Sequence, residues 1–137
     1  MVPLNGGPPQ SEIPNTPAQA AGIAASGAET KNTGHTEWPD GRVHHTGFTA
    51  TMAPNTVVPY TNAGQVLDAD YNSWQEGKSG RSGSPTYAII TSRSYHSGGV
   101  VNTAMADGST HAIASDIALP VWRAMATRAG AETISQP

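Results

Sequence analysis

The chain has 137 residues, of which 36% are hydrophobic and only 12% are charged, with 15 glycines, 11 prolines and no cysteine. This composition predicts one small, loop-rich domain with a thin core, and it excludes disulfides, thiolate zinc sites and a cysteine nucleophile. Because the formal net charge of −3 comes without any basic block, we expect no nucleic-acid partner.

Residues 1–34 are predicted to form a linker or disordered tail. They hold five prolines and an Ala/Gly/Ser-rich run, and proline removes backbone donors and biases its predecessor towards extended geometry. The stretch 18–29 could form one or two weak helical turns, but Gly22 and Gly27 disfavour them. The globular domain is therefore expected at residues 35–137.

Turn signals and β-branched residues predict that this domain is rich in β-structure. Pro39-Asp40-Gly41 is a turn, because proline presets φ and glycine permits positive φ. Strands are expected at 47–52, 56–60 and 86–92, and residues 61–85 are expected to form a long polar connection.

Asp107-Gly108 predicts a β-hairpin, because both turn positions of this dipeptide can adopt positive φ. The flanking strands are expected at 100–106 and 109–115. A two-residue turn then places on one face the residues Val101, Thr103, Met105, Thr110, Ala112 and Ala114.

A closing helix is predicted from Pro120, which suits a first helical turn, to Gly130, a natural left-handed cap. Trp122 and Met125 lie on its apolar stripe. Because a helix this short is unstable alone, both side chains are expected to dock on the sheet. Together these elements predict a β-rich α+β fold with a small antiparallel sheet and a C-terminal helix.

A calcium site is one interpretation of the acidic segment around Asp68. Asp68, Asp70 and Asn72 place oxygen side chains at alternate positions, as a Ca²⁺ loop requires, and Glu76 could add a carboxylate or a bridging water. The match then fails, because serines stand where a glycine and a bidentate glutamate are needed. A solvated polar loop is the favoured alternative, and no other cofactor is expected.

The histidines offer a second candidate metal site. Imidazole is the commonest metal ligand, and some of the histidines lie near Glu37 in the sequence. No spacing matches a His-x-x-x-His helix, and neighbours on a strand point to opposite faces, so we favour surface or turn histidines. The set is His35, His44, His45, His96 and His111.

Hydrolytic catalysis is not supported by any motif. His96 and Asp107 could be imagined as a dyad beside Ser94 or Ser97, but no Gly-x-Ser-x-Gly elbow occurs, and the hairpin already accounts for Asp107. The protein is expected not to be an enzyme.

Three stretches of the chain resemble a known family. SYHSGGVVNTAMADGS contains His96 and Asp107-Gly108, DIALPVWRAMATRAGAE follows it, and GHTEWPDGRVHHTGFTATMAPNT covers residues 34–56. Together they resemble the large prepilin-like family of unknown function found in many copies in planctomycete bacteria, whose C-terminal domain is named for a His, nine residues and Asp-Gly. Here ten residues separate His96 from Asp107, so a β-bulge is expected near residues 98–101.

The resemblance implies a pilin-like head domain in which the motif residues are structural, with His96 tied to neighbouring backbone. Family members resemble type IV prepilins at their N-terminus, so this chain is expected to be a C-terminal fragment that lacks the pilin helix. No apolar run here reaches the ~20 residues of a membrane span, so the chain alone is expected to be soluble and to lack a targeting signal, with membrane contact only through the missing helix. The motif residues are His96, Gly98, Gly99, Asp107 and Gly108.

Two functions are consistent with these observations. The favoured one is a non-enzymatic, pilin-like structural or surface-assembly protein of the cell envelope, whose partners are pilin-like subunits or further copies of itself. The alternative is an extracytoplasmic module that binds a ligand or Ca²⁺ through residues 61–85.

Overall fold

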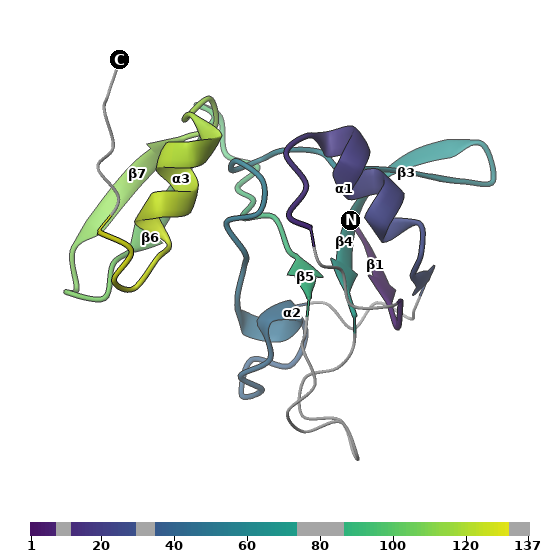
Figure 1. The fold of residues 1–137 in the computed structure, drawn as a ribbon, viewed down its shortest axis with the longest axis horizontal. Helices are drawn as coiled ribbons and strands as arrows, with labels where there is room; N and C mark the ends of the chain where they lie inside the picture. Colours follow the sequence, from purple (N-terminus) through teal and green to yellow (C-terminus); the bar gives the residue numbers. More distant parts are fainter. Residues whose placement is uncertain (8–11, 30–34, 74–86, 132–137) are drawn as a thin grey trace.

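The computed structural model describes residues 1–7, 12–29, 35–73 and 87–131. These residues form two packed groups of elements (Figure 1). One is a five-stranded mixed sheet with a helix against it, and the other is a two-stranded hairpin with the C-terminal helix against it. The α+β class is confirmed, while the expected small antiparallel sheet corresponds only to the hairpin.

Strand β4 (Gln65–Asn72) is the centre of the larger sheet. Its first half pairs antiparallel with β3 (Pro59–Asn62). Its second half lies between β1 (Val2–Asn5), which runs parallel to it, and β5 (Ala88–Ile89), which runs antiparallel. The short β2 (Ala28–Glu29) pairs antiparallel with the other edge of β1.

Helix α1 (Pro17–Ala24) packs on this sheet and corrects the prediction of a linker or disordered tail over residues 1–34. The Thr16 hydroxyl accepts a hydrogen bond from the Gln19 amide at 3.2 Å, and the Gln19 side chain accepts one from the Thr16 amide at 3.2 Å. This capping box satisfies donors that a helix start otherwise leaves unpaired. Two alanines of α1 are fully buried, so tertiary packing outweighs the weak helix propensity of the segment.

The main core lies between α1 and one face of the sheet. Alternation along β4 places Ala69 and Tyr71 on this face, where Leu4 of β1 joins them with no exposed surface. The N-terminal strand is thus an integral part of the core. The buried cluster consists of Leu4, Ala20, Ala24, Met52, Val58, Ala69, Tyr71 and Ile89.

Residues 61–85 were expected to be a polar connection, but their described part contains most of the β3–β4 hairpin. Ala63 and Gly64 both have positive φ, 47° and 79°, and form a two-residue turn between the strands. Such turns match the right-handed twist of the flanking strands. The loop prediction is therefore wrong for residues 61–72, and residues 74–85 lie outside the described ranges.

The strand expected at 47–52 does not form. The only regular element described between residues 35 and 58 is α2 (Val43–Thr46), a single helical turn. Thr49 lies in irregular backbone and bonds to the residue after β5. Its amide donates to the Ile90 carbonyl at 2.8 Å, and its hydroxyl accepts from the Ile90 amide at 3.0 Å. The β-branched residues here anchor a loop to the end of β5.

The C-terminal hairpin joins β6 (Val100–Ala104) and β7 (Thr110–Ala114). Its register differs by one residue from the predicted one, because Val101 pairs with Ile113. The reason is the loop length, which is three residues instead of two: the amide before the loop, on Met105, donates to the Ser109 carbonyl at 2.8 Å.

Helix α3 (Leu119–Met125) packs on this hairpin as predicted, although it ends before Gly130. Trp122 is buried against the hairpin and Met125 packs beside it. The Phe48 ring stacks on Trp122 with centroids 5.7 Å apart, which attaches the irregular segment to this second core. No helix in the described ranges combines the length and the apolar character needed to cross a membrane.

Candidate functional site on the polar face of the central strand

Strand β4 has two chemically different faces. Ala69 and Tyr71 face the core, and Asp68, Asp70 and Asn72 alternate with them on the opposite face. The alternating oxygen side chains, interpreted as a Ca²⁺ loop, are therefore the period-two pattern of a strand. Asp70 and Asn72 are almost completely buried, so these polar groups require partners within the protein.

Arg93 is the main partner of the two aspartates. Its Nε and Nη2 donate to the Asp68 carboxylate at 2.6 and 2.9 Å, and its Nη1 donates to Asp70 Oδ1 at 2.6 Å. Backbone amides complete the arrangement, since Val58 donates to Asp68 at 2.9 Å and Thr91 donates to Asp70 at 3.2 Å. One guanidinium thus neutralises two carboxylates, a geometry suited to the planar fork of arginine.

The electrostatics of this group follow from its burial. Burial raises the pKa of Asp70, and the Arg93 guanidinium opposes part of that rise. Burial alone would lower the pKa of Arg93, but its hydrogen bonds to Asp68 and its pairing with Asp70 outweigh burial and raise it. The two carboxylates of the proposed Ca²⁺ set therefore already hold a cation, and Glu76 lies outside the described residues.

Asn72 connects this face to the histidines of α2. Its side-chain nitrogen donates to His44 Nδ1 at 2.7 Å, and since an amide nitrogen only donates, Nδ1 of His44 is unprotonated. Burial, and to a lesser extent the neighbouring His45, whose ring centroid is 4.0 Å away, lower the pKa of His44 to about 4. The prediction of surface or turn histidines is wrong for these two, because a helical turn buries both rings.

His35 approaches the same network from the other side. Its amide donates to the His44 carbonyl at 2.9 Å, and its Nε2 lies 3.9 Å from Asp70 Oδ2. Of the histidines considered with Glu37, His45 lies beside it. Arg93 was not predicted as a partner of this face, and no local motif gives a signal for it.

Gly98 and Gly99 lie in a turn before β6, where a β-bulge was expected, and His96 lacks the expected bond to backbone of the described ranges. Gly98 and Gly99 have positive φ, 115° and 60°, and the Ser115 amide and hydroxyl both donate to the Gly99 carbonyl at 2.8 and 2.7 Å. Because residues 100–104 pair with 110–114 in continuous register, the β-bulge expected near residues 98–101 is not formed within β6. His96 is exposed and makes no hydrogen bond within the described residues, so the expected tie to backbone is wrong.

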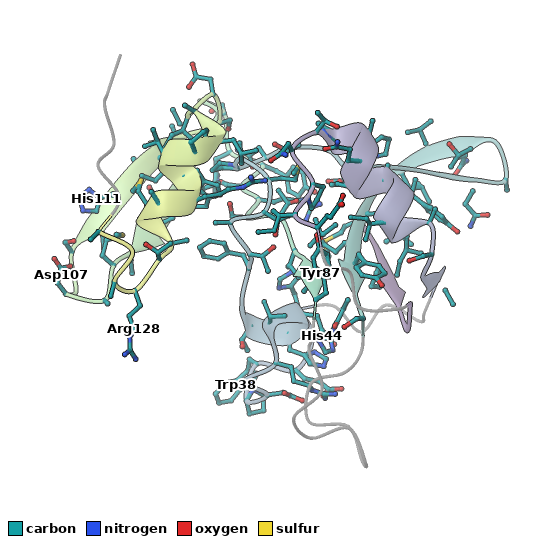
Figure 2. The ribbon with its side chains drawn as sticks, viewed as in Figure 1. Trp38, His44, Tyr87, Asp107, His111 and Arg128 are labelled. Atoms are coloured by element: carbon teal, nitrogen blue, oxygen red, sulfur yellow. The ribbon has the colours of Figure 1, made fainter. Side chains whose placement is uncertain are left out.

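Asp107 and Gly108 shape the loop of the C-terminal hairpin (Figure 2). Asp107 Oδ1 accepts a hydrogen bond from the Ser109 amide at 2.9 Å, which lowers the pKa of Asp107. Gly108 has φ of 86°, which a residue with a side chain rarely adopts. Both residues are structural, as predicted.

A cavity of about 660 Å³ opens beside the polar face. Its lining includes Thr91 and Ser92, whose buried hydroxyls have no hydrogen-bond partner among the residues that the structure describes. Phe48, Tyr95 and His96 also line it and are exposed. No local pattern predicts this cavity, because its walls come from segments far apart along the chain.

One comparison with known proteins gives a match. The model of the family described as Protein of unknown function (DUF1559), with the short name SBP_bac_10, matches residues 7–119. No curated protein and no solved structure matches the chain. Since the matched range extends from the end of β1 to the start of α3 and covers most of the chain, the protein belongs to this family of unknown function.

Proposed function

We propose that this chain is a non-enzymatic, pilin-like structural subunit of an assembly in the bacterial cell envelope or on the cell surface. The resemblance carried by His96, Asp107-Gly108 and the closing helix motivates this role. The chemistry of the polar face supports it, because the carboxylates of the partly buried Asp68 and the buried Asp70 accept structural hydrogen bonds from Arg93.

The observation that carries the proposal is the shape and surface of the β3–β4 hairpin. It extends away from the rest of the sheet (Figure 1), and all residues from 61 to 66 are exposed. Within the described residues β3 pairs only with β4, so its outer edge is open. Val66 is 69% exposed on this hairpin and Val57 is exposed just before it. An open edge with apolar neighbours is a template for strand addition from another chain.

A second copy of this chain is the occupant that we propose for this edge. Sedimentation velocity over a concentration series should show reversible self-association of the wild-type protein. Val66→Lys should shift the equilibrium towards the monomer, because a lysine on an edge hairpin disfavours strand pairing. Trp38→Lys is the matched control, since Trp38 is 86% exposed and lies far from the hairpin (Figures 1 and 2).

The control distinguishes a specific interface from non-specific association through exposed apolar surface. A wild-type protein that stays monomeric at every concentration would refute self-assembly through β3. Equal effects of both substitutions would also refute it, because association would then depend only on total exposed apolar surface.

A second candidate function, ligand binding by an extracytoplasmic module, is favoured by the cavity beside the polar face. Unpaired buried hydroxyls at Thr91 and Ser92 and an exposed ring at Tyr95 suit a polyhydroxylated ligand such as a sugar. Saturable stabilisation in thermal melts by one member of a monosaccharide panel, lost in Tyr95→Ala but kept in Trp38→Ala, would support it. The absence of any such stabilisation would count against it.

A further inference from the structure

We infer that Glu37, Asp40 and His45 form a binding site for one divalent transition-metal ion, best matched by Zn²⁺. This site is separate from the hairpin on which the proposed assembly role depends. One potential ligand atom from each of the three residues lies within 4.8 Å of the other two.

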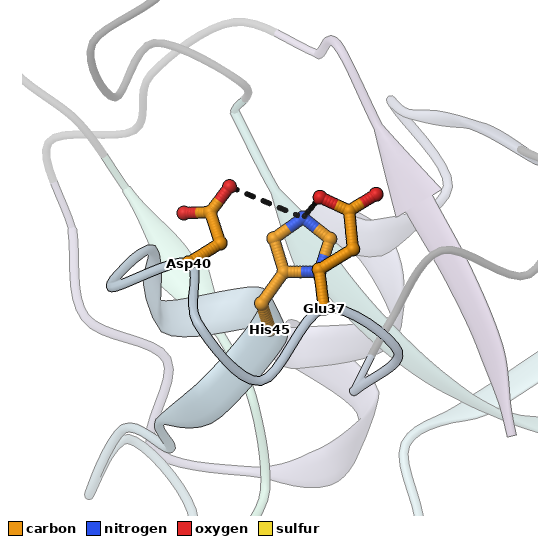
Figure 3. Close-up of side chains that lie close together, drawn as sticks. All are labelled: Glu37, Asp40 and His45. Atoms are coloured by element: carbon orange, nitrogen blue, oxygen red, sulfur yellow. Dashed lines mark ion pairs between the residues drawn. The ribbon is translucent and has the colours of Figure 1, made fainter.

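The local fold brings the three side chains together. The Asp40 amide donates to the Glu37 carbonyl at 2.9 Å, which closes a turn and places the two carboxylates on the same side. The His45 amide donates to the Arg42 carbonyl at 2.9 Å and begins the single turn of α2. His45 therefore faces the carboxylates from a separate, backbone-bonded turn (Figure 3).

The distances suit a shared cation. His45 Nε2 lies 3.7 Å from Glu37 Oε2 and 4.0 Å from Asp40 Oδ2. Ligands that each lie about 2.1 Å from a tetrahedral zinc are themselves about 3.4 Å apart. The two distances from His45 Nε2 exceed that spacing by only about 0.3 and 0.6 Å, and the two carboxylate oxygens lie within 4.8 Å of each other.

The state of His45 is the independent observation that points to a ligand. Its side chain is only 2% exposed, its Nδ1 is buried without a hydrogen-bond partner, and no hydrogen bond to its Nε2 is present in the described residues. Buried polar groups are normally hydrogen-bonded; a metal ion would supply the missing partner of Nε2, whereas Nδ1, on another side of the ring, would stay without one. Here Nε2 is directed at two carboxylate oxygens that a bound metal would join to it.

Arg42 is the internal competitor for this position. Its Nη2 pairs with Asp40 Oδ2 and lies 3.8 Å from Glu37 Oε2. Arg42 is therefore close to the same two carboxylate oxygens as His45. The guanidinium holds the pKa of Asp40 well below its usual range, which keeps this ligand ionised at neutral pH. A metal ion has to displace Arg42 from these oxygens, so Arg42 sets the affinity.

The donor set selects the class of metal. One imidazole nitrogen and two carboxylate oxygens suit zinc and related transition metals, whereas Ca²⁺ prefers six to eight oxygen ligands. Three protein ligands leave a fourth position for water, as in open zinc sites.

Isothermal titration calorimetry of the chelator-treated 137-residue chain with ZnCl₂ tests the site. We expect one zinc per chain, a loss of affinity of about tenfold or more in Glu37→Gln and His45→Gln, and a gain in Arg42→Gln. His96→Gln is the matched control and should bind like the wild type, because His96 is exposed and is not one of the three clustered residues. Glu37 has a half-exposed side chain, so its variant keeps the test valid if the buried His45 variant does not fold.

Each outcome decides the inference. Absence of zinc binding by the wild type overturns it, as does binding that is unchanged in Glu37→Gln or equally reduced in His96→Gln. Displacement of zinc by equimolar Ca²⁺ would overturn the choice of metal class. Loss of zinc affinity with unchanged self-association in Glu37→Gln would keep this site distinct from the assembly role.

Discussion

Arg93 is the cation that compensates the buried carboxylates of β4, and replacing it tests this account quantitatively. Its side chain is 8% exposed, and that of Asp70 is 4% exposed. Arg93→Met keeps an unbranched apolar stem but leaves Asp70 and the half-buried Asp68 without their counter-charge. Breaking a buried pair in this way costs about 3–5 kcal/mol, a large part of the roughly 5–15 kcal/mol that stabilises a domain.

Urea denaturation at pH 7 measures this loss, with Arg128→Met as the control because Arg128 is exposed. The double variant Arg93→Met/Asp70→Asn should recover about 1–2 kcal/mol, since the amide oxygen still accepts from the Thr91 amide and no buried charge remains. Without Arg93, the pKa of Asp70 is raised further by burial. Its protonation therefore stabilises the folded variant, and the cost of Arg93→Met should shrink as the pH falls from 7 towards 4.

Two results would refute this reasoning. One is a cost of Arg93→Met below about 1 kcal/mol, the value typical of an exposed ion pair. The other is a double variant that is less stable than Arg93→Met alone, because the aspartate would then stabilise the fold without its partner.

Three further predictions concern other parts of the fold. Trp122→Ala should lower the free energy of unfolding by about 3–5 kcal/mol, whereas Trp38→Ala should change it by less than about 0.5 kcal/mol; equal effects in urea denaturation would contradict the second core. The pKa of His44 is lowered from 6.5 to about 4. Between pH 6.5 and about 4, His44 is therefore protonated in the unfolded chain but not in the folded one, so the folded state loses stability as the pH falls through this window. The full shift corresponds to a loss of about 3 kcal/mol in the free energy of unfolding, which solvent screening reduces to about 1–2 kcal/mol. If His44→Gln leaves the pH dependence of stability unchanged, His44 is not its cause. Gly108→Ala should cost about 1 kcal/mol because of its positive φ, while Gly41→Ala, in open space, should be nearly neutral in thermal melts; a neutral Gly108→Ala would disprove the turn assignment.

The C-terminal hairpin shows how far local sequence patterns can predict this fold. Asp107-Gly108 located the turn and both strands, because turn chemistry depends on neighbouring residues alone. It did not define the loop length. One additional loop residue shifts the pairing register by one, so the side chains that face a given residue of β6 come from the other face of β7 than predicted. The need to bury Val101 and Ile113 together selects the observed register, and this is a tertiary requirement.

The segment around β4 was misinterpreted because two structures share one pattern. Oxygen side chains at alternate positions occur both in a Ca²⁺ loop and on one face of a strand. The intervening Ala69 and Tyr71, together with the lack of a glycine for a tight turn, favoured the strand. The pairing of β4 with β1, and of its carboxylates with Arg93, connects residues distant in sequence and has no local signal.

The N-terminal segment contained a signal that was overlooked. Thr16 and Gln19 have the spacing of a capping box, and the proline at position 17 suits a first helical turn. The abundance of proline and glycine nevertheless favoured a tail. Composition describes the average residue of a segment. A few buried residues such as Leu4 are nevertheless enough to hold the whole segment in the core.

The parallel pairing of β1 with β4 has a consequence for the order of folding. Val2 pairs with Ala69, so β1 can join β4 only after most of the sheet sequence has been synthesised, although its other edge can pair with β2 earlier. The β3–β4 hairpin closes through a two-residue turn and costs little loop entropy. We therefore expect this hairpin to form first and β1 to dock late, with a folding rate limited by this long-range contact rather than by its helices.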